Sequence, residues 1–258
     1  MGSRTSKYQL PSCNTNEVLH LKQSDGDINA ESFFTASQAC RVSGAAKLWP
    51  CSCWDEQWLQ STLGDHIVQI SYKDACGNEV RREKEQLRSL LSKFSEQDEN
   101  ITAASDRIVP YIDNFDIFSL APDLRIDVPS EKLFGPEREL VIYGGFLGPA
   151  GSVTRIHFDS EDNIITCIFG RKLFVVAPPN STLDYAARDI PLENPWSPDI
   201  EAAVKKHPLF AKCPNSVQAV ILEPGDVFIQ PKGWHHWVHN LSLALSVPCW
   251  AKILPSMD

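Results

Sequence analysis

Short apolar segments separated by glycine, proline and asparagine fill the chain from about residue 106 onward. Segments of this length, bounded by turn residues, are typical of β-strands. Gly170-Arg171, between two apolar runs, predicts a hairpin turn. A succession of short strands with turns throughout favours a small closed or sandwiched barrel. The expected strands span residues 140–143, 154–158, 164–169, 172–177, 219–222, 226–230 and 243–250.

The first 105 residues have a different character. Residues 1–30 are polar and aperiodic, and we expect them to form a loose lead-in. Residues 31–105 are expected to be helix-rich, with helices at 55–63 and 81–94 and a strand at 66–72. Residues 106–258 form the expected barrel, interrupted by one helix at 197–208. The sequence therefore predicts a mainly β domain with flanking helices over residues 31–258.

Composition and charge restrict the classes of binding partner and the cellular compartments that the sequence predicts. The hydrophobic content of 43% and the 7 tryptophans are ample for a packed core. The net charge of −9 argues against nucleic acid and suits a basic peptide partner better. No apolar run approaches the roughly 18 residues of a membrane span, and residues 1–38 lack a secretory hydrophobic region. We therefore expect a protein of the cytoplasm or nucleus that is neither secreted nor embedded in a membrane.

The 8 cysteines of an unsecreted chain are expected to be reduced thiols buried as small hydrophobic groups. Cys51 and Cys53, with Cys40 and Cys76 nearby, offer an alternative interpretation as a zinc site. Zinc knuckles usually place two to four residues between paired cysteines, whereas a single residue separates Cys51 from Cys53. The spacing favours the buried thiols.

His157-Phe158-Asp159 is the segment with the most specific chemistry. Residues two apart at the end of a strand project to the same side, so His157 and Asp159 can converge on one ion. A second histidine from a strand folded back beside them would complete the two-histidine, one-carboxylate ligand set of non-haem iron(II) oxygenases. The strand at 226–230 leads to three candidates, which are His235, His236 and His239. Neighbouring side chains on an extended chain face opposite ways, so only one of His235 and His236 can point at the ion.

Several further segments are similar to the Jumonji-C family of iron(II)- and 2-oxoglutarate-dependent oxygenases. The resemblance runs from about Ala39 to Trp250 and favours the small protein-hydroxylase branch, the factor-inhibiting-HIF-like hydroxylases. The matching segments are 44–50, Trp58-Leu59, 111–115, Asn163, 170–172 and 225–231. The resemblance implies a double-stranded β-helix, that is, a jelly-roll or cupin-like barrel. It also implies iron(II), 2-oxoglutarate and dioxygen as cofactor and co-substrates.

Residue roles follow from the same resemblance. The family's second histidine ligand comes five residues after the strand-ending proline, which selects His236 when counted from Pro231. The metal ligands would then be His157, Asp159 and His236. The residues matching the family's 2-oxoglutarate contacts are Lys172, Thr154, Asn163 and Tyr111. Pro248 departs from the pattern, because some relatives carry a small polar side chain there that can donate a hydrogen bond.

The sequence around Lys172 gives a second reason to expect that this residue binds the co-substrate. It is the only charge in the apolar run 172–176, fifteen residues past His157. An unpaired buried ammonium group is energetically costly, and a bound carboxylate would supply its partner. The alternative is a lysine at a strand end that points into solvent.

The implied reaction is hydroxylation of a side chain of a protein or peptide substrate, with 2-oxoglutarate decarboxylated to succinate. Three alternatives stay open. An N-methyl-lysine or N-methyl-arginine demethylase, histone demethylases included, would use the same chemistry, and so would a tRNA-nucleoside hydroxylase. A catalytically silent barrel that only binds a partner is the alternative outside enzymes. We expect a monomer.

Overall fold

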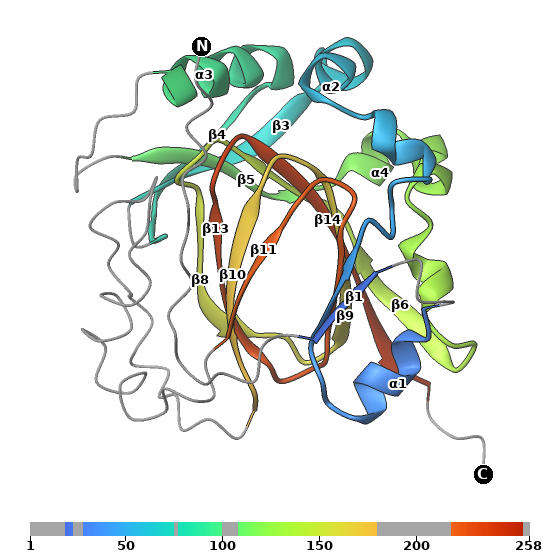
Figure 1. Ribbon diagram of the computed structural model, residues 1–258. Helices are drawn as coiled ribbons and strands as arrows, with labels where there is room; N and C mark the ends of the chain where they lie inside the picture. The colour runs from blue at the N-terminus through green and yellow to red at the C-terminus, as the bar shows by residue number, and fades with distance from the viewer. Residues whose placement is uncertain (1–18, 23–27, 75–76, 100–107, 180–217, 255–258) are drawn as a thin grey trace, which may run out of the picture.

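Two β-sheets face each other and enclose the centre of the molecule (Figure 1). The computed structural model describes residues 19–22, 28–74, 77–99, 108–179 and 218–254. The expected helix at 197–208 lies outside the described residues. The two facing sheets confirm the expected mainly β fold of the double-stranded β-helix or jelly-roll type.

The smaller sheet has four antiparallel strands. Their order is β11 (Gln218–Leu222), β10 (Lys172–Ala177), β13 (His235–Asn240) and β8 (Val153–Phe158). The predicted turn at Gly170-Arg171 leads into β10, and Gly170 has φ +73°. A Cβ there would lie 2.0 Å from the carbonyl oxygen of Leu243, so both the backbone angle and the close approach require glycine.

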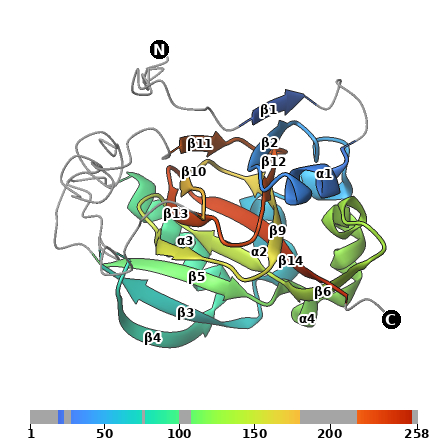
Figure 2. The same ribbon diagram turned by 90° about the horizontal axis from the view of Figure 1, so that it is seen from below.

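The larger sheet has ten strands, antiparallel except for one pair at its edge. β6 (Arg138–Tyr143) pairs with the C-terminal part of β14, and the other nine strands follow one path. In order along the sheet they are β1 (Leu19–Lys22), β2 (Cys40–Ser43), β12 (Val227–Gln230), β9 (Asp162–Phe169), β14 (Ala244–Ile253), β7 (Gly145–Gly148), β5 (Val109–Phe115), β3 (Ile67–Lys73) and β4 (Glu79–Gln86). Figure 2 shows β1 and β2 at the opposite end of the sheet from β3 and β4.

The helices pack on the outer face of the larger sheet. They are α1 (Ala30–Thr35), α2 (Glu56–Leu63), α3 (Leu87–Glu99) and α4 (Ile117–Leu120), with 3-10 turns at Pro50–Cys53, Pro122–Asp127 and Pro129–Leu133. Leu59 of α2 and Phe94 of α3 share a buried cluster with Val247 of β14. Asp55 caps α2 by accepting a hydrogen bond from the Trp58 amide at 2.7 Å. This outer layer fixes the larger sheet and leaves its inner face for the pocket.

Apolar side chains from both sheets meet in part of the space between them. Ile165 of β9, Phe174 of β10 and Phe228 of β12 belong to one buried cluster there. Phe174 and Phe228 lie 5.3 Å apart between ring centroids. This apolar packing fills part of the barrel, and Ile165 and Phe174 also face the pocket in the remaining space.

The predicted helix at 81–94 was wrong in its first part. Residues 79–86 form β4, whose charged side chains pair with β3, and α3 begins only at Leu87. Leu87, Leu90 and Phe94 are buried, as the helical spacing predicted. Residues 19–22 of the expected lead-in form strand β1, which pairs with β2. β2, β5, β7 and β13 were not among the strands expected from the sequence.

Candidate metal centre and adjoining pocket

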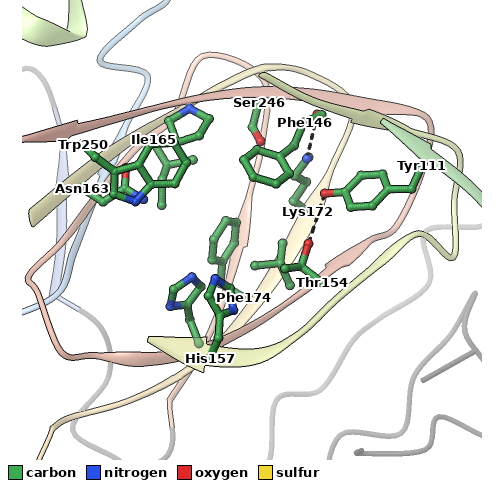
Figure 3. Close-up of a pocket in the computed structure, with 13 residues that line it drawn as sticks. Tyr111, Phe146, Thr154, His157, Asn163, Ile165, Lys172, Phe174, Ser246 and Trp250 are labelled. Carbon is green, nitrogen blue, oxygen red and sulfur yellow. Dashed lines mark hydrogen bonds between the residues drawn. The ribbon is translucent and has the colours of Figure 1, made fainter. Parts of the chain in front are cut away.

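A pocket opens between the two sheets and encloses about 360 Å³ of empty space, counting its open mouth (Figure 3). Both sheets contribute to its wall, and most of its lining residues are apolar or aromatic. They are Tyr111, Phe146, Thr154, His157, Asn163, Ile165, Lys172, Phe174, His236, Val238, Ser246, Pro248 and Trp250. The pocket therefore contains six of the seven candidate site residues, and the seventh, Asp159, lies beside it.

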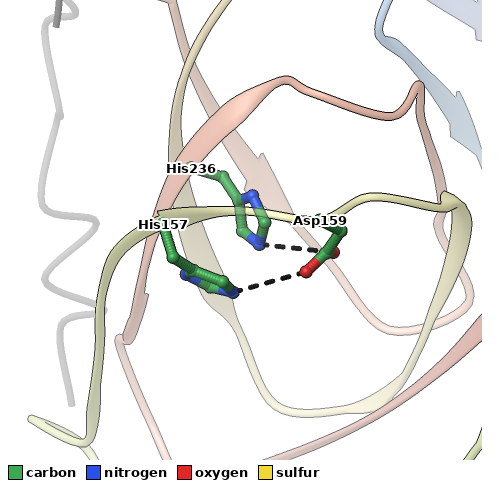
Figure 4. Close-up of side chains that lie close together, drawn as sticks. All are labelled: His157, Asp159 and His236. Atoms are coloured by element: carbon green, nitrogen blue, oxygen red, sulfur yellow. Dashed lines mark ion pairs between the residues drawn. The ribbon is translucent and has the colours of Figure 1, made fainter. Parts of the chain in front are cut away.

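His157, Asp159 and His236 meet at this pocket (Figure 4). Their ligand atoms all lie within 4.8 Å of one another. Asp159 Oδ1 is 3.7 Å from His157 Nε2, and Asp159 Oδ2 is 3.8 Å from His236 Nε2. Two metal bonds of about 2 Å can bridge gaps of this size. Among the described residues this is the one group of three or more potential ligands at metal-binding distance.

Strand pairing between β8 and β13 brings the two histidines together. His157 and His236 are direct cross-strand partners, and their rings lie 4.0 Å apart between centroids. Asp159 follows the end of β8, two residues after His157. His235 packs against Phe158 and His239 lies near Trp237, on the opposite face of β13. The alternation of side chains thus separates His236 from the two competing histidines.

An irregularity in β8 lets a second polar residue share the pocket. Thr154 pairs with Val238, and His157 pairs with His236, so three steps along β8 match two steps along β13. This is the count of a β-bulge, which changes the alternation of side chains beyond it. Thr154 and His157 both line the pocket although strict alternation would place them on opposite faces.

Backbone carbonyls orient both histidine rings. His157 Nδ1–H donates to the carbonyl of Arg155 at 2.8 Å, which leaves the Nε2 lone pair free for a metal. His236 Nδ1 lies 3.2 Å from the Trp234 carbonyl. Burial, with a smaller effect from His157, lowers the pKa of His236 to about 3. His236 is therefore neutral near pH 7, which is the form that binds metals.

Two donors hold the Asp159 carboxylate. Trp250 Nε1–H donates to Asp159 Oδ2 at 2.8 Å, and Asn163 Nδ2 lies 3.4 Å from the same oxygen. From the sequence, Asn163 was expected to contact the co-substrate, and no role was expected for Trp250. Both residues lie on the larger sheet, whereas His157 belongs to the smaller one. Contacts across the barrel mouth therefore fix the carboxylate.

Lys172 is an ammonium group inside the barrel. It is 1% exposed, and its Nζ donates to the carbonyl of Phe146 at 3.0 Å. The rings of Tyr111 and Phe146 lie 5.9 Å from Nζ. In the part of the chain that the structure describes, no carboxylate forms an ion pair with it. Burial lowers the pKa of Lys172 to about 7, so the pocket favours a ligand that brings negative charge.

Two hydroxyl groups lie on the pocket wall beside Lys172 (Figure 3). Thr154 Oγ1–H donates to the Tyr111 hydroxyl at 3.3 Å, so the Tyr111 proton can be donated to a ligand. Burial raises the pKa of Tyr111, which keeps that proton in place. A Cβ on Gly148 would lie 2.6 Å from the Tyr111 ring, so glycine makes room for this side chain.

Pro248 lies on the pocket wall, where it has no N–H or side-chain donor. Ser246, two residues earlier on β14, lines the same pocket. Residues two apart on a strand share a face, so Ser246 supplies a hydroxyl on the wall that Pro248 leaves without a donor. Ser246 was not among the site residues expected from the sequence.

The two facing sheets and this pocket define a jelly-roll protein with a two-histidine, one-carboxylate cluster at the barrel mouth. Residues 26–253 match the family model of the cupin-like domain. The chain belongs to this family and, within it, to the JmjC-type oxygenases. The three potential metal ligands and the buried lysine fit a centre that holds iron(II) beside a dicarboxylate. Within the described residues, no helix is long and apolar enough to cross a membrane.

Curated relatives share the family over most of this chain. JmjC domain-containing protein A of Dictyostelium discoideum is 28% identical over 208 residues, which is 77% of this chain and 82% of that protein. Lysine-specific demethylase 8 of Xenopus tropicalis is 28% identical over 81% of this chain. Jumonji C domain-containing protein 5 of Drosophila melanogaster is 26% identical over 84% of it. This chain spans 47% and 55% of the last two proteins.

Proposed function

We propose that this protein is an iron(II)- and 2-oxoglutarate-dependent dioxygenase that hydroxylates a side chain of a protein substrate. Dioxygen is consumed, and 2-oxoglutarate is decarboxylated to succinate. The observation that carries the proposal is the pairing of two features in one pocket. His157, Asp159 and His236 lie at its mouth, and the buried ammonium of Lys172 lies in its wall.

In this proposal His157, Asp159 and His236 would hold the iron. Bound there, iron(II) supplies the one-electron and dioxygen chemistry that no amino-acid side chain can provide. The carbonyl of Arg155 keeps His157 in the tautomer whose Nε2 is free. Burial keeps His236 neutral, so this ring need not lose a proton at neutral pH before it binds metal.

The co-substrate contacts follow from charge. 2-Oxoglutarate carries two carboxylates, and Lys172 is the buried cation that can pair with the one remote from the keto group. The Tyr111 hydroxyl, which accepts from Thr154, donates a second hydrogen bond to that carboxylate. Asn163, held against Asp159, is placed to contact the other end of the molecule. Phe146, Phe174 and Trp250 exclude water from the pocket between these contacts.

Co-substrate binding is expected to depend on pH through Lys172. Burial lowers its pKa to about 7, so the ligand-free pocket holds the charged amine below that pH and the neutral amine above it. A bound carboxylate stabilises the ammonium, so binding above about pH 7 takes up a proton. The affinity for 2-oxoglutarate should therefore fall by up to about tenfold per pH unit there. Calorimetry in buffers of different ionisation heat measures this uptake, and an affinity that does not change between about pH 6.5 and 8.5 would contradict the role of Lys172.

The Tyr111 hydroxyl is expected to make a smaller contribution. Tyr111→Phe keeps the buried ring and removes one neutral hydrogen bond to the carboxylate. The KM for 2-oxoglutarate should rise by about two- to tenfold, equivalent to ~0.5–1.5 kcal/mol, while kcat changes little. Tyr72→Phe is the matched control, because Tyr72 lies outside the pocket and stacks on Arg81. A KM that moves equally in both variants would remove Tyr111 from the site.

Two outcomes of the same oxidation at carbon are the leading candidates for the reaction on the prime substrate. The protein-hydroxylase branch is favoured by the sequence resemblance. Demethylation of N-methyl-lysine is the second candidate, because one curated relative is named Lysine-specific demethylase 8. Hydroxylation of an N-methyl carbon gives an unstable alcohol that releases formaldehyde, so the same site serves either outcome. The net charge of −9 suits a basic peptide substrate, and we propose a monomer acting in the cytoplasm or nucleus.

Product analysis tests the proposed function. Protein extracts are incubated with the purified chain, iron(II) and 2-oxoglutarate, and their peptides are compared by mass spectrometry with a reaction containing His157→Ala. A gain of one oxygen atom on an unmethylated residue supports the hydroxylase, and loss of a methyl group with formaldehyde release supports the demethylase. Oxidised nucleosides in added tRNA would transfer the assignment to RNA. Absence of 2-oxoglutarate turnover with every substrate would leave the silent binding module.

A further inference from the structure

Three polar residues form a row across the inner face of the larger sheet. Gln230 of β12 pairs with Asn163 of β9, and Asn163 pairs in turn with Trp250 of β14. Directly paired residues of neighbouring antiparallel strands project to the same side. Gln230, Asn163 and Trp250 are called the cross-strand row below.

Each member of the cross-strand row contacts a candidate metal ligand. Trp250 Nε1 lies 2.8 Å from Asp159 Oδ2, and Asn163 Nδ2 lies 3.4 Å from the same oxygen. The side-chain amide nitrogen of Gln230, Nε2, lies 3.0 Å from His236 Nδ1. His157 is held in a different way, because its Nδ1 donates to the backbone carbonyl of Arg155 on its own strand. The row therefore reaches two of the three ligands from the opposite sheet.

We infer that the cross-strand row positions Asp159 and His236 and thereby sets the metal affinity of the site. The inference rests on the proposed function. Trp250 and Asn163 both occupy Asp159 Oδ2, so Oδ1 is the oxygen left to bind metal, and the carboxylate acts as a one-oxygen ligand. Fixing the carboxylate before metal arrives removes the cost of ordering it during binding.

The Gln230 amide completes the same arrangement. Metal binding at His236 Nε2 requires the proton on Nδ1, where the Trp234 carbonyl accepts it. Gln230 is 1% exposed, and its Oε1 has no partner among the described residues. An amide turned so that Oε1 faces Nδ1 provides a second acceptor for that proton. The buried Oε1 then accepts a hydrogen bond from His236 Nδ1–H, and this stabilises the tautomer that binds metal.

Metal titration of single variants tests this role without catalysis. Cobalt(II) is added to each protein in the absence of co-substrate, and the visible spectrum and dissociation constant are recorded. Trp250→Phe is expected to weaken binding by about 10- to 100-fold and to alter the cobalt spectrum. Gln230→Leu should weaken binding in the same range, whereas Gln230→Glu, which keeps an acceptor beside Nδ1, should restore it.

Trp54→Phe is the matched control. Trp54 is buried, and its indole N–H donates to the Asp127 carboxylate at 3.3 Å, in the cluster beneath α2. This variant loses a comparable hydrogen bond and should keep wild-type cobalt affinity. If Trp250→Phe and Gln230→Leu also keep wild-type affinity, the row has no positioning role and the proposed function stands. If the wild-type protein binds no cobalt, the proposed function itself is wrong.

Discussion

Replacing Lys172 by methionine should strongly weaken 2-oxoglutarate binding and at the same time stabilise the protein. The ammonium is 1% exposed, and its one hydrogen bond within the described residues is to the Phe146 carbonyl. Removing one partner of a buried charge pair costs about 2–5 kcal/mol, which corresponds to a rise in KM or Kd of roughly 30-fold to several thousand-fold. The ligand-free protein loses an unfavourable buried charge, so its Tm should rise by a few degrees.

Lys252→Met provides the matched control for the expected loss of co-substrate affinity and gain of stability in Lys172→Met. Lys252 is 55% exposed and pairs with Glu139 at 3.0 Å, a surface ion pair expected to contribute little. Its removal should leave both Tm and co-substrate affinity within error of the wild type. A Lys172→Met protein with a lower Tm and unchanged 2-oxoglutarate affinity would show that Lys172 is a structural residue.

Replacing Asp159 by alanine should eliminate metal binding and turnover while the barrel stays folded. Asp159 is the only carboxylate in the three-residue cluster, and its side chain is 14% exposed at the mouth of the barrel. The variant keeps two imidazoles, which bind a divalent ion far more weakly than the complete set. Metal content after dialysis and succinate formation should both fall to background, and the thermal transition should remain cooperative.

Asp65→Ala controls for the loss of a carboxylate in general. Asp65 is 82% exposed and contacts Arg88 on the surface, away from the pocket. Its replacement should leave metal content and turnover at wild-type values. If Asp159→Ala retains stoichiometric metal, Asp159 is not a ligand and the centre must be built from other groups.

The sequence predicted the features that depend on local pattern. The strands from β8 to β12 were expected within two residues of their ends, because most of them contain an apolar run and turn residues bound them. Burial of Lys172 was expected from its place in such a run, and the structure agrees. These inferences succeed because a buried strand must be apolar along its length.

The errors arise where long-range pairing overrides local preference. Residues 81–86 carry charges at a spacing compatible with a helix, but β3 offers an edge on which they form β4 instead. β7 is only four residues long and contains two glycines, so its extended form depends on β5 and β14 beside it. No local signal marks such a strand.

Two parts of the site could not be predicted from the sequence, because both depend on contacts between distant segments of the chain. The bulge that turns Thr154 and His157 to one face is visible only in the pairing of β8 with β13. Trp250 reaches Asp159 across 91 positions of sequence, and a tryptophan near the end of an apolar strand looks like ordinary core. The segment His157-Phe158-Asp159 could be recognised from the local sequence, but the residues that hold Asp159 in place could not.

An anaerobic titration tests the central claim most directly, because it needs no prime substrate. Iron(II) chelated by a 2-oxo acid gives a visible charge-transfer absorption band. Adding 2-oxoglutarate to the iron-loaded protein without oxygen should produce this band up to one equivalent of iron. The band should be absent in His157→Ala, and in Lys172→Met it should need far higher 2-oxoglutarate. No band in the wild-type protein, or an equal band in His157→Ala, would contradict the assignment of the site.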